Sequence, residues 1–176
     1  MKLLELNHAL TGQWVMQYAH RIPIERGRGI LVGAILAAEG EPNPGVNRAA
    51  RLENCVLAAQ RLAEKDPGSH PLLVKLLQSS PELTQEAILM GLLKSDMPAP
   101  HEVIAGLGFR SEVGQSIALL IRARQGVKLS AEELRHLSLM VRGGAGLQEP
   151  LRLQAAWVYL KMTEQDRTAL AHVLGK

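Results

Sequence analysis

The chain has 176 residues, of which 47% are hydrophobic and 21% are charged. These proportions are typical of a folded globular chain and exclude the low-hydrophobicity composition of a disordered one. The net charge of +3 comes from 20 Lys and Arg residues interspersed with 17 Asp and Glu residues, without a long basic run. Because only 3% of the residues are aromatic and could stack on bases, this composition argues against nucleic-acid binding.

The aliphatic composition favours helices, and the spacing of apolar residues predicts them along the first half of the chain. Residues 3–20 show a period near 3.6, and the helix expected at 29–39 lacks a polar face, which predicts that it is buried. Asn47 is the expected N-cap of a helix over 48–65. The apolar stripe expected on that helix consists of Leu52, Cys55, Val56, Ala59 and Leu62.

Cap and breaker residues mark the helices of the second half. Pro81 and Glu82 favour a helix start, Ser111 is an expected N-cap, and Ser130 to Glu133 form a capping box that opens a helix ending at Val141. The other helices are expected at 71–79, 82–94, 101–107, 111–124, 149–162 and 164–174. We therefore expect a single all-α domain, a bundle of about nine helices, in which helices of residues 1–46 pack on a core of residues 47–176.

The compartment is predicted from the single cysteine and the apolar runs. Cys55 lies in an apolar stretch, where a buried and inert thiol is usual, and this fits a reducing cytoplasm. The longest apolar run, residues 30–38, is too short to span a bilayer, and we expect neither a targeting segment nor a membrane segment.

The polar residues give weak signals for chemistry. The histidines at 8, 20, 70, 101, 136 and 172 form neither an i, i+4 pair nor an HExxH motif, so each is predicted to be a surface or loop residue.

The stretch "RGGAG" offers Arg142 and backbone N–H groups to an anion, but it lacks the Lys-Ser/Thr of a phosphate loop, and a flexible connection is favoured. Arg21, Arg26 and Arg28 flank glycines and could meet phosphate or an acidic partner, but a solvated loop is favoured.

Two stretches carry a resemblance to a known family. The run "HPLLVKLLQSSPELTQEAILMGLLKSD" begins with a His-Pro pair and ends an apolar helix with Lys-Ser-Asp, and "HEVIAGLGFRSEVGQSIALLIRA" and "LRLQAAWVYLKM" follow it. Residues 47–165 resemble the HD-domain phosphohydrolases, particularly the branch that hydrolyses guanosine tetraphosphate. The resemblance implies an HD-type helical bundle and, in the family, a divalent metal held by histidines and aspartates.

The departures from the family pattern concern the metal ligands themselves. His70 matches one ligand, but Lys94 and Ser95 replace the His-Asp pair, and Trp157 stands at the position of the late aspartate. No histidine between 47 and 69 matches the upstream ligand. The resemblance therefore implies a dismantled metal site, and we expect no metal and no cofactor. Lys94 could hold a phosphate-bearing ligand there, although a solvated Lys at a helix C-terminus is favoured.

The sequence leaves three hypotheses for function. The leading one is a non-catalytic regulatory or adaptor protein that binds a protein partner, with self-association as a further expectation. The second is a metal-dependent nucleotide phosphohydrolase whose rearranged site uses His70, Asp96 and His101. The third is a metal-free nucleotide sensor that uses Lys94 and Arg142 on phosphates. The candidate ligand-binding residues are thus His70, Lys94, Asp96 and Arg142.

Overall fold

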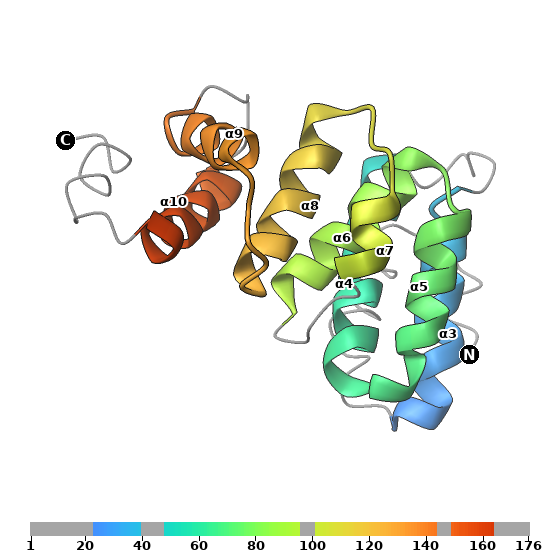
Figure 1. Cartoon of the computed structure of the whole chain (residues 1–176). Coiled ribbons are helices and arrows are strands. Elements are labelled where there is room, and N and C mark those ends of the chain that lie inside the picture. The colour runs from blue at the N-terminus through green and yellow to red at the C-terminus, as the bar shows by residue number, and fades with distance from the viewer. Residues whose placement is uncertain (1–22, 40–47, 96–100, 144–148, 164–176) are drawn as a thin grey trace. The chain divides into compact units, whose positions relative to one another are not determined.

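The computed structural model describes residues 23–39, 48–95, 101–143 and 149–163 of the chain. These residues form helices and turns, and no strand occurs among them (Figure 1). The prediction of an all-α structure is therefore confirmed for this part of the chain. The expected helices at 3–20 and 164–174, together with Asn47 and Asp96, lie outside the described residues.

The helices follow one another in an order close to the predicted one. They are α3 (Ile24–Leu36), α4 (Arg48–Lys65), the 3₁₀ helix η2 (Pro67–Ser69), α5 (His70–Ser79), α6 (Glu82–Lys94), α7 (His101–Gly106), α8 (Glu112–Arg124), α9 (Ala131–Val141) and α10 (Glu149–Thr163). Their contacts divide the chain into two compact units, Met1–Val103 and Ile104–Lys176. Below they are called the N-terminal unit and the C-terminal unit, and whether they act as one domain stays a prediction.

Helix α4 is the centre of the N-terminal unit, because α3, η2, α5 and α6 all contact it. Its closest neighbour is α6, whose Gly91 lies against the α4 backbone. A Cβ atom at Gly91 would lie 2.5 Å from the Val56 carbonyl oxygen and 2.7 Å from the Ala59 Cβ. The small residues at this contact therefore set how near the two helices come to each other.

The buried face of α4 only partly matches the predicted stripe. Cys55, Ala59 and Leu62 are buried as predicted, whereas Leu52 and Val56 are only half-buried. Ala58 and Ala63 are buried in addition. Alanines widen the buried face because their small side chains allow two other helices to pack closely on α4.

The structure corrects two predictions about α3. The helix begins at Ile24 instead of 29, since the Pro23 carbonyl already accepts the N–H groups of Arg26 and Gly27 at 2.9 and 3.0 Å. The prediction that it is buried all round is wrong, because Leu31 is buried while Leu36 is 58% exposed. Only one face of α3 packs on α4.

The early start of α3 also corrects the prediction that Arg26 and Arg28 lie in a loop, because both residues are part of the helix. Arg21 lies outside the described residues.

The predicted helix starts in the C-terminal unit are confirmed by their cap hydrogen bonds. The Ser111 hydroxyl accepts the N–H of Gly114 at 2.9 Å at the start of α8. At the start of α9, the Ser130 hydroxyl accepts the Glu133 N–H, and the Glu133 carboxylate accepts the Ser130 N–H, so the capping box is complete. These bonds satisfy backbone donors that the first helical turn leaves without a partner.

Three helices build the described part of the C-terminal unit. Helix α10 contacts both α8 and α9, which also contact each other. Arg122 of α8 forms an ion pair with Glu133 of α9. The buried side chains of this unit include Ile117, Leu120, Leu137, Met140 and Ala155.

None of the helices in the described ranges is both long enough and apolar enough to cross a membrane.

Substituting Gly91 by Ala tests the close contact between α4 and α6. The new methyl group would overlap backbone atoms of α4, and the helices must separate to accommodate it. We expect Gly91→Ala to lower the free energy of unfolding by about 1–3 kcal/mol, the usual range for overpacking. Urea denaturation followed by circular dichroism measures this change.

Gly33→Ala is the matched control, since Gly33 lies inside α3 and nothing lies within 4 Å of a Cβ atom there. Its higher helix propensity is expected to stabilise the protein by up to about 1 kcal/mol. Equal unfolding midpoints for the two variants would contradict the close contact.

Candidate functional site

The four candidate residues from the sequence do not form one described site. His70 and Lys94 lie in the N-terminal unit, Arg142 lies in the C-terminal unit, and Asp96 lies outside the described residues. His101 opens α7, but its side chain is not among those described. Within the described ranges no three His, Cys, Asp or Glu side chains group so that they could hold a metal ion.

His70 and Lys94 have different surroundings. His70 is the first residue of α5, and its Nε2 atom is buried without a hydrogen-bond partner in the described part of the chain. Lys94 is exposed in the last turn of α6, where the helix dipole favours a positive charge. Helix structure alone explains the position of Lys94.

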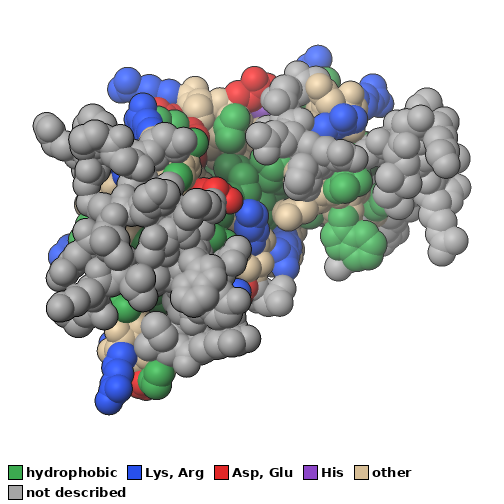
Figure 2. Space-filling view, turned by 180° about the vertical axis from the view of Figure 1, so that it is seen from behind, with side chains coloured by type: hydrophobic (Ala, Val, Ile, Leu, Met, Phe, Trp, Pro, Cys, Tyr) green, Lys and Arg blue, Asp and Glu red, His purple; other side chains and the backbone are tan. Residues whose placement is uncertain are grey.

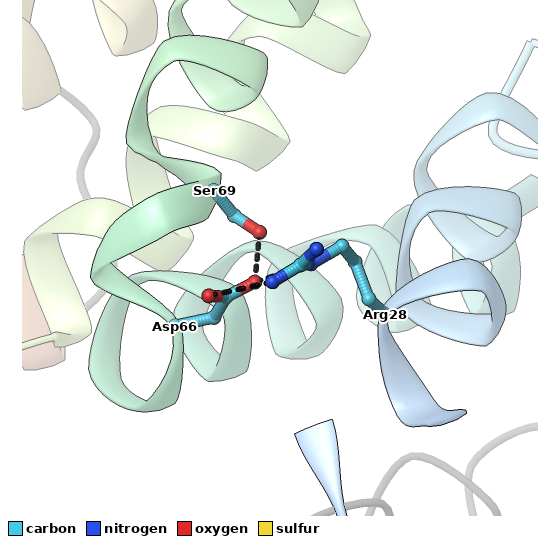
Figure 3. A network of polar contacts seen from close by, with 3 residues as sticks. All are labelled: Arg28, Asp66 and Ser69. Carbon is cyan, nitrogen blue, oxygen red and sulfur yellow. Dashed lines mark hydrogen bonds and ion pairs between the residues drawn. The ribbon is translucent and has the colours of Figure 1, made fainter. Parts of the chain in front are cut away.

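A polar cluster that no sequence pattern indicated joins the exposed Arg28 to two buried residues just before His70, Asp66 and Ser69. The carboxylate of Asp66 accepts two hydrogen bonds from the Arg28 guanidinium, from Nε at 2.6 Å and from Nη2 at 3.0 Å (Figure 3). The Ser69 hydroxyl donates a further hydrogen bond to the same carboxylate. Asp66 is only 7% exposed, so the arrangement pairs a buried charge with a bidentate partner.

The Arg28–Asp66–Ser69 cluster connects α3 to the turn that leads into α5. The hydrogen bonds from Arg28 and then from Ser69 lower the pKa of the Asp66 carboxyl below its usual value. Both oxygens of the carboxylate are occupied, and the cluster therefore stabilises the fold rather than offering a ligand site. The pattern "DPGS" marked only a helix end in the sequence, because the partner arginine is 38 residues away.

A serine and a histidine meet in the C-terminal unit. The Ser116 Oγ of α8 lies 3.1 Å from the His136 Nε2 of α9, a distance that would suit a nucleophile and its base. Ser116 is completely buried, however, so no substrate could reach its hydroxyl. The pair joins two helices, and the prediction of His136 as a surface or loop histidine is wrong because the side chain is half-buried against α8.

The most conspicuous surface feature is an apolar face on α10, formed by Leu153 and Trp157. One helical turn separates these residues, which places them side by side on the helix. Leu153 is 42% exposed and Trp157 is 60% exposed. Hydrophobic side chains are visible at the molecular surface in Figure 2. This feature, called the α10 face below, leaves a large aromatic ring in contact with water.

The net positive charge of the chain comes from the same unit. Residues 104–176 contain ten of the 20 Lys and Arg residues but only six of the 17 Asp and Glu residues. The acidic six are Glu112, Glu132, Glu133, Glu149, Glu164 and Asp166. The C-terminal unit therefore combines an exposed apolar face with a net positive charge.

Comparisons with protein-family models, with curated proteins and with solved structures found no match to this chain.

Acid unfolding tests the role of the Arg28–Asp66–Ser69 cluster. Because the pKa of Asp66 is lowered by folding, its contribution to stability is present above its unfolded pKa, about 3.9, and is lost as the pH falls through the folded pKa. We expect Asp66→Asn to be less stable than the wild type at pH 7 and to lose less of its stability between pH 5 and the acid range. Urea midpoints measured across the pH series check this.

A double-mutant cycle with Arg28→Gln isolates the pair. The effects of Asp66→Asn and Arg28→Gln are expected to sum to more than the effect of the double variant. Strict additivity would mean that the two side chains do not interact in solution.

Proposed function

We propose that the protein acts without catalysis, as a regulatory or adaptor protein that binds a partner protein through the α10 face. The exposure of Trp157 is the observation that carries this proposal. Tryptophan is among the residues that contribute most to binding energy at interfaces, because burying its ring removes a large apolar area from water. Leu153, one turn away, extends the area that a partner can cover.

The apolar face and the net positive charge of the C-terminal unit indicate which kind of partner we propose. An amphipathic helix can place its apolar stripe against Leu153 and Trp157, as in the recognition of helices by apolar surfaces. The excess of Lys and Arg in residues 104–176 favours a partner whose flanking residues are Asp and Glu. The proposed partner is therefore an acidic amphipathic helix of another protein, rather than a second copy of this basic unit.

The HD-type ancestry belongs to the same proposal. It rests on the sequence pattern, in which the His70-Pro71 pair stands at the start of α5 and Lys94 at the end of α6. The ammonium group of Lys94 and the indole of Trp157 have no lone pair to offer a cation. These replacements support a binding protein derived from a metal-dependent enzyme, with His70 as a remnant of the former ligand set.

A cytoplasmic location is proposed with it. Burial raises the pKa of the Cys55 thiol to about 12, so the chain's one cysteine is shielded from oxidants and needs no oxidising compartment to pair it.

Photo-crosslinking in the protein's native cells tests the proposed interface. A photoreactive phenylalanine analogue placed at Leu153 is expected to link to one dominant partner, because this position lies in the α10 face. Mass spectrometry identifies the linked peptide, which we expect to have an apolar residue every three or four positions with Asp and Glu between them.

The same analogue at Lys128 is the matched control, since Lys128 is exposed in the same unit but lies in the turn before α9. It is expected to give no dominant product. A crosslink from Leu153 only to a second copy of the chain, or no dominant product at all, would contradict the proposed partner.

A further inference from the structure

The turn after α9 brings together a glycine and an arginine that the proposed function does not use. Gly143 has a φ of +80° and follows the C-cap residue Arg142. Its N–H donates to the Met140 carbonyl at 3.1 Å, so α9 ends in a turn whose last residue has the left-handed backbone conformation. Residues with a side chain rarely adopt this conformation, which explains a glycine at the position.

Arg152 of α10 lies directly against this turn. A Cβ atom at Gly143 would lie 3.2 Å from the Arg152 Cζ, 3.3 Å from Nη2 and 3.4 Å from Nε. The absence of a side chain at Gly143 therefore leaves space for the guanidinium group. The turn conformation and the position of Arg152 both depend on the same glycine.

The guanidinium of Arg152 has an unused donor. Its Nε atom is buried, yet no hydrogen-bond partner for it occurs in the described part of the chain. A buried donor of a charged group without an acceptor is costly, and such groups are normally satisfied. Arg142, which precedes Gly143, is exposed and adds a second positive charge at the same turn.

We infer that Arg152 and Arg142 form a binding site for a phosphate-type oxyanion beside Gly143, at the C-terminal end of α9. The planar guanidinium can donate two parallel hydrogen bonds to the oxygens of a phosphate group, and an oxyanion would supply the acceptor that Nε lacks. Free phosphate and a phosphate group on a larger molecule share this chemistry. The inference is independent of the proposed protein contact, since it uses neither Leu153 nor Trp157.

A structural role for Arg152 is the competing explanation. A guanidinium near the C-terminus of α9 also interacts favourably with the negative end of the helix dipole. In that case Arg152 would stabilise the helix end and would bind no ligand. The two explanations differ in what happens when phosphate is added to the folded protein.

Titration of the ¹⁵N-labelled full chain with inorganic phosphate separates them. We expect a saturable shift of the Arg152 Nε–H signal, assigned by its loss in Arg152→Gln, and a rise of the thermal midpoint. Acetate at the same ionic strength is expected to give neither effect. Arg152→Lys keeps the charge but not the planar fork, and we expect it to bind phosphate roughly tenfold more weakly.

Arg135→Gln is the matched control, because it removes one positive charge from an exposed position on α9 and should keep the full response. Phenyl phosphate distinguishes the two sources: binding as tight as that of inorganic phosphate supports a site that accepts a phosphate group on a larger molecule, and weaker binding supports one for the free ion. The inference is overturned if phosphate causes no saturable shift in the wild type, if acetate acts equally well, or if Arg152→Gln retains the stabilisation by phosphate.

Discussion

The N-terminal unit depends on the close contact between α4 and α6. At Gly91 the backbones come so near that a single methyl group would overlap the Val56 carbonyl oxygen. Ala58, Ala59 and Ala63 of α4 are buried, as are Ile88 and Leu92 of α6, and this apolar burial contributes to the stability of the unit. Helices α3 and α5 then pack on a pair whose spacing is already set.

Polar contacts position the remaining elements around this core. The Arg28–Asp66–Ser69 cluster ties α3 to the turn after α4, and in the C-terminal unit the contacts of Ser116 with His136 and of Arg122 with Glu133 connect α8 to α9. These hydrogen bonds and ion pairs hold helices together, and the binding that we propose uses other residues, on the surface of α10 and at Arg152.

Local signals made most of the described helices predictable, since apolar periodicity and caps such as Ser111 and Ser130 act within a few residues. The start of α3 differs from the prediction because glycines at 27 and 29 favour a break, whereas the helix already begins at Ile24 with Pro23 as its N-cap residue. The contact of Arg28 with Asp66 spans 38 residues, and no local pattern announces it. Likewise, the exposure of Trp157 depends on which face of α10 packs inward. The sequence does not indicate that face, because apolar residues lie on several sides of α10.

The central claim is that this chain binds rather than catalyses, and its metal content tests that claim most directly. The protein is purified without chelator beside a His70→Ala variant, and Mn, Fe and Zn are quantified per chain by mass spectrometry. Because Lys94 and Trp157 stand where the resemblance requires metal ligands, we predict no stoichiometric metal in either sample. Near-stoichiometric metal in the wild type that disappears in His70→Ala would contradict the claim and indicate a functional phosphohydrolase site.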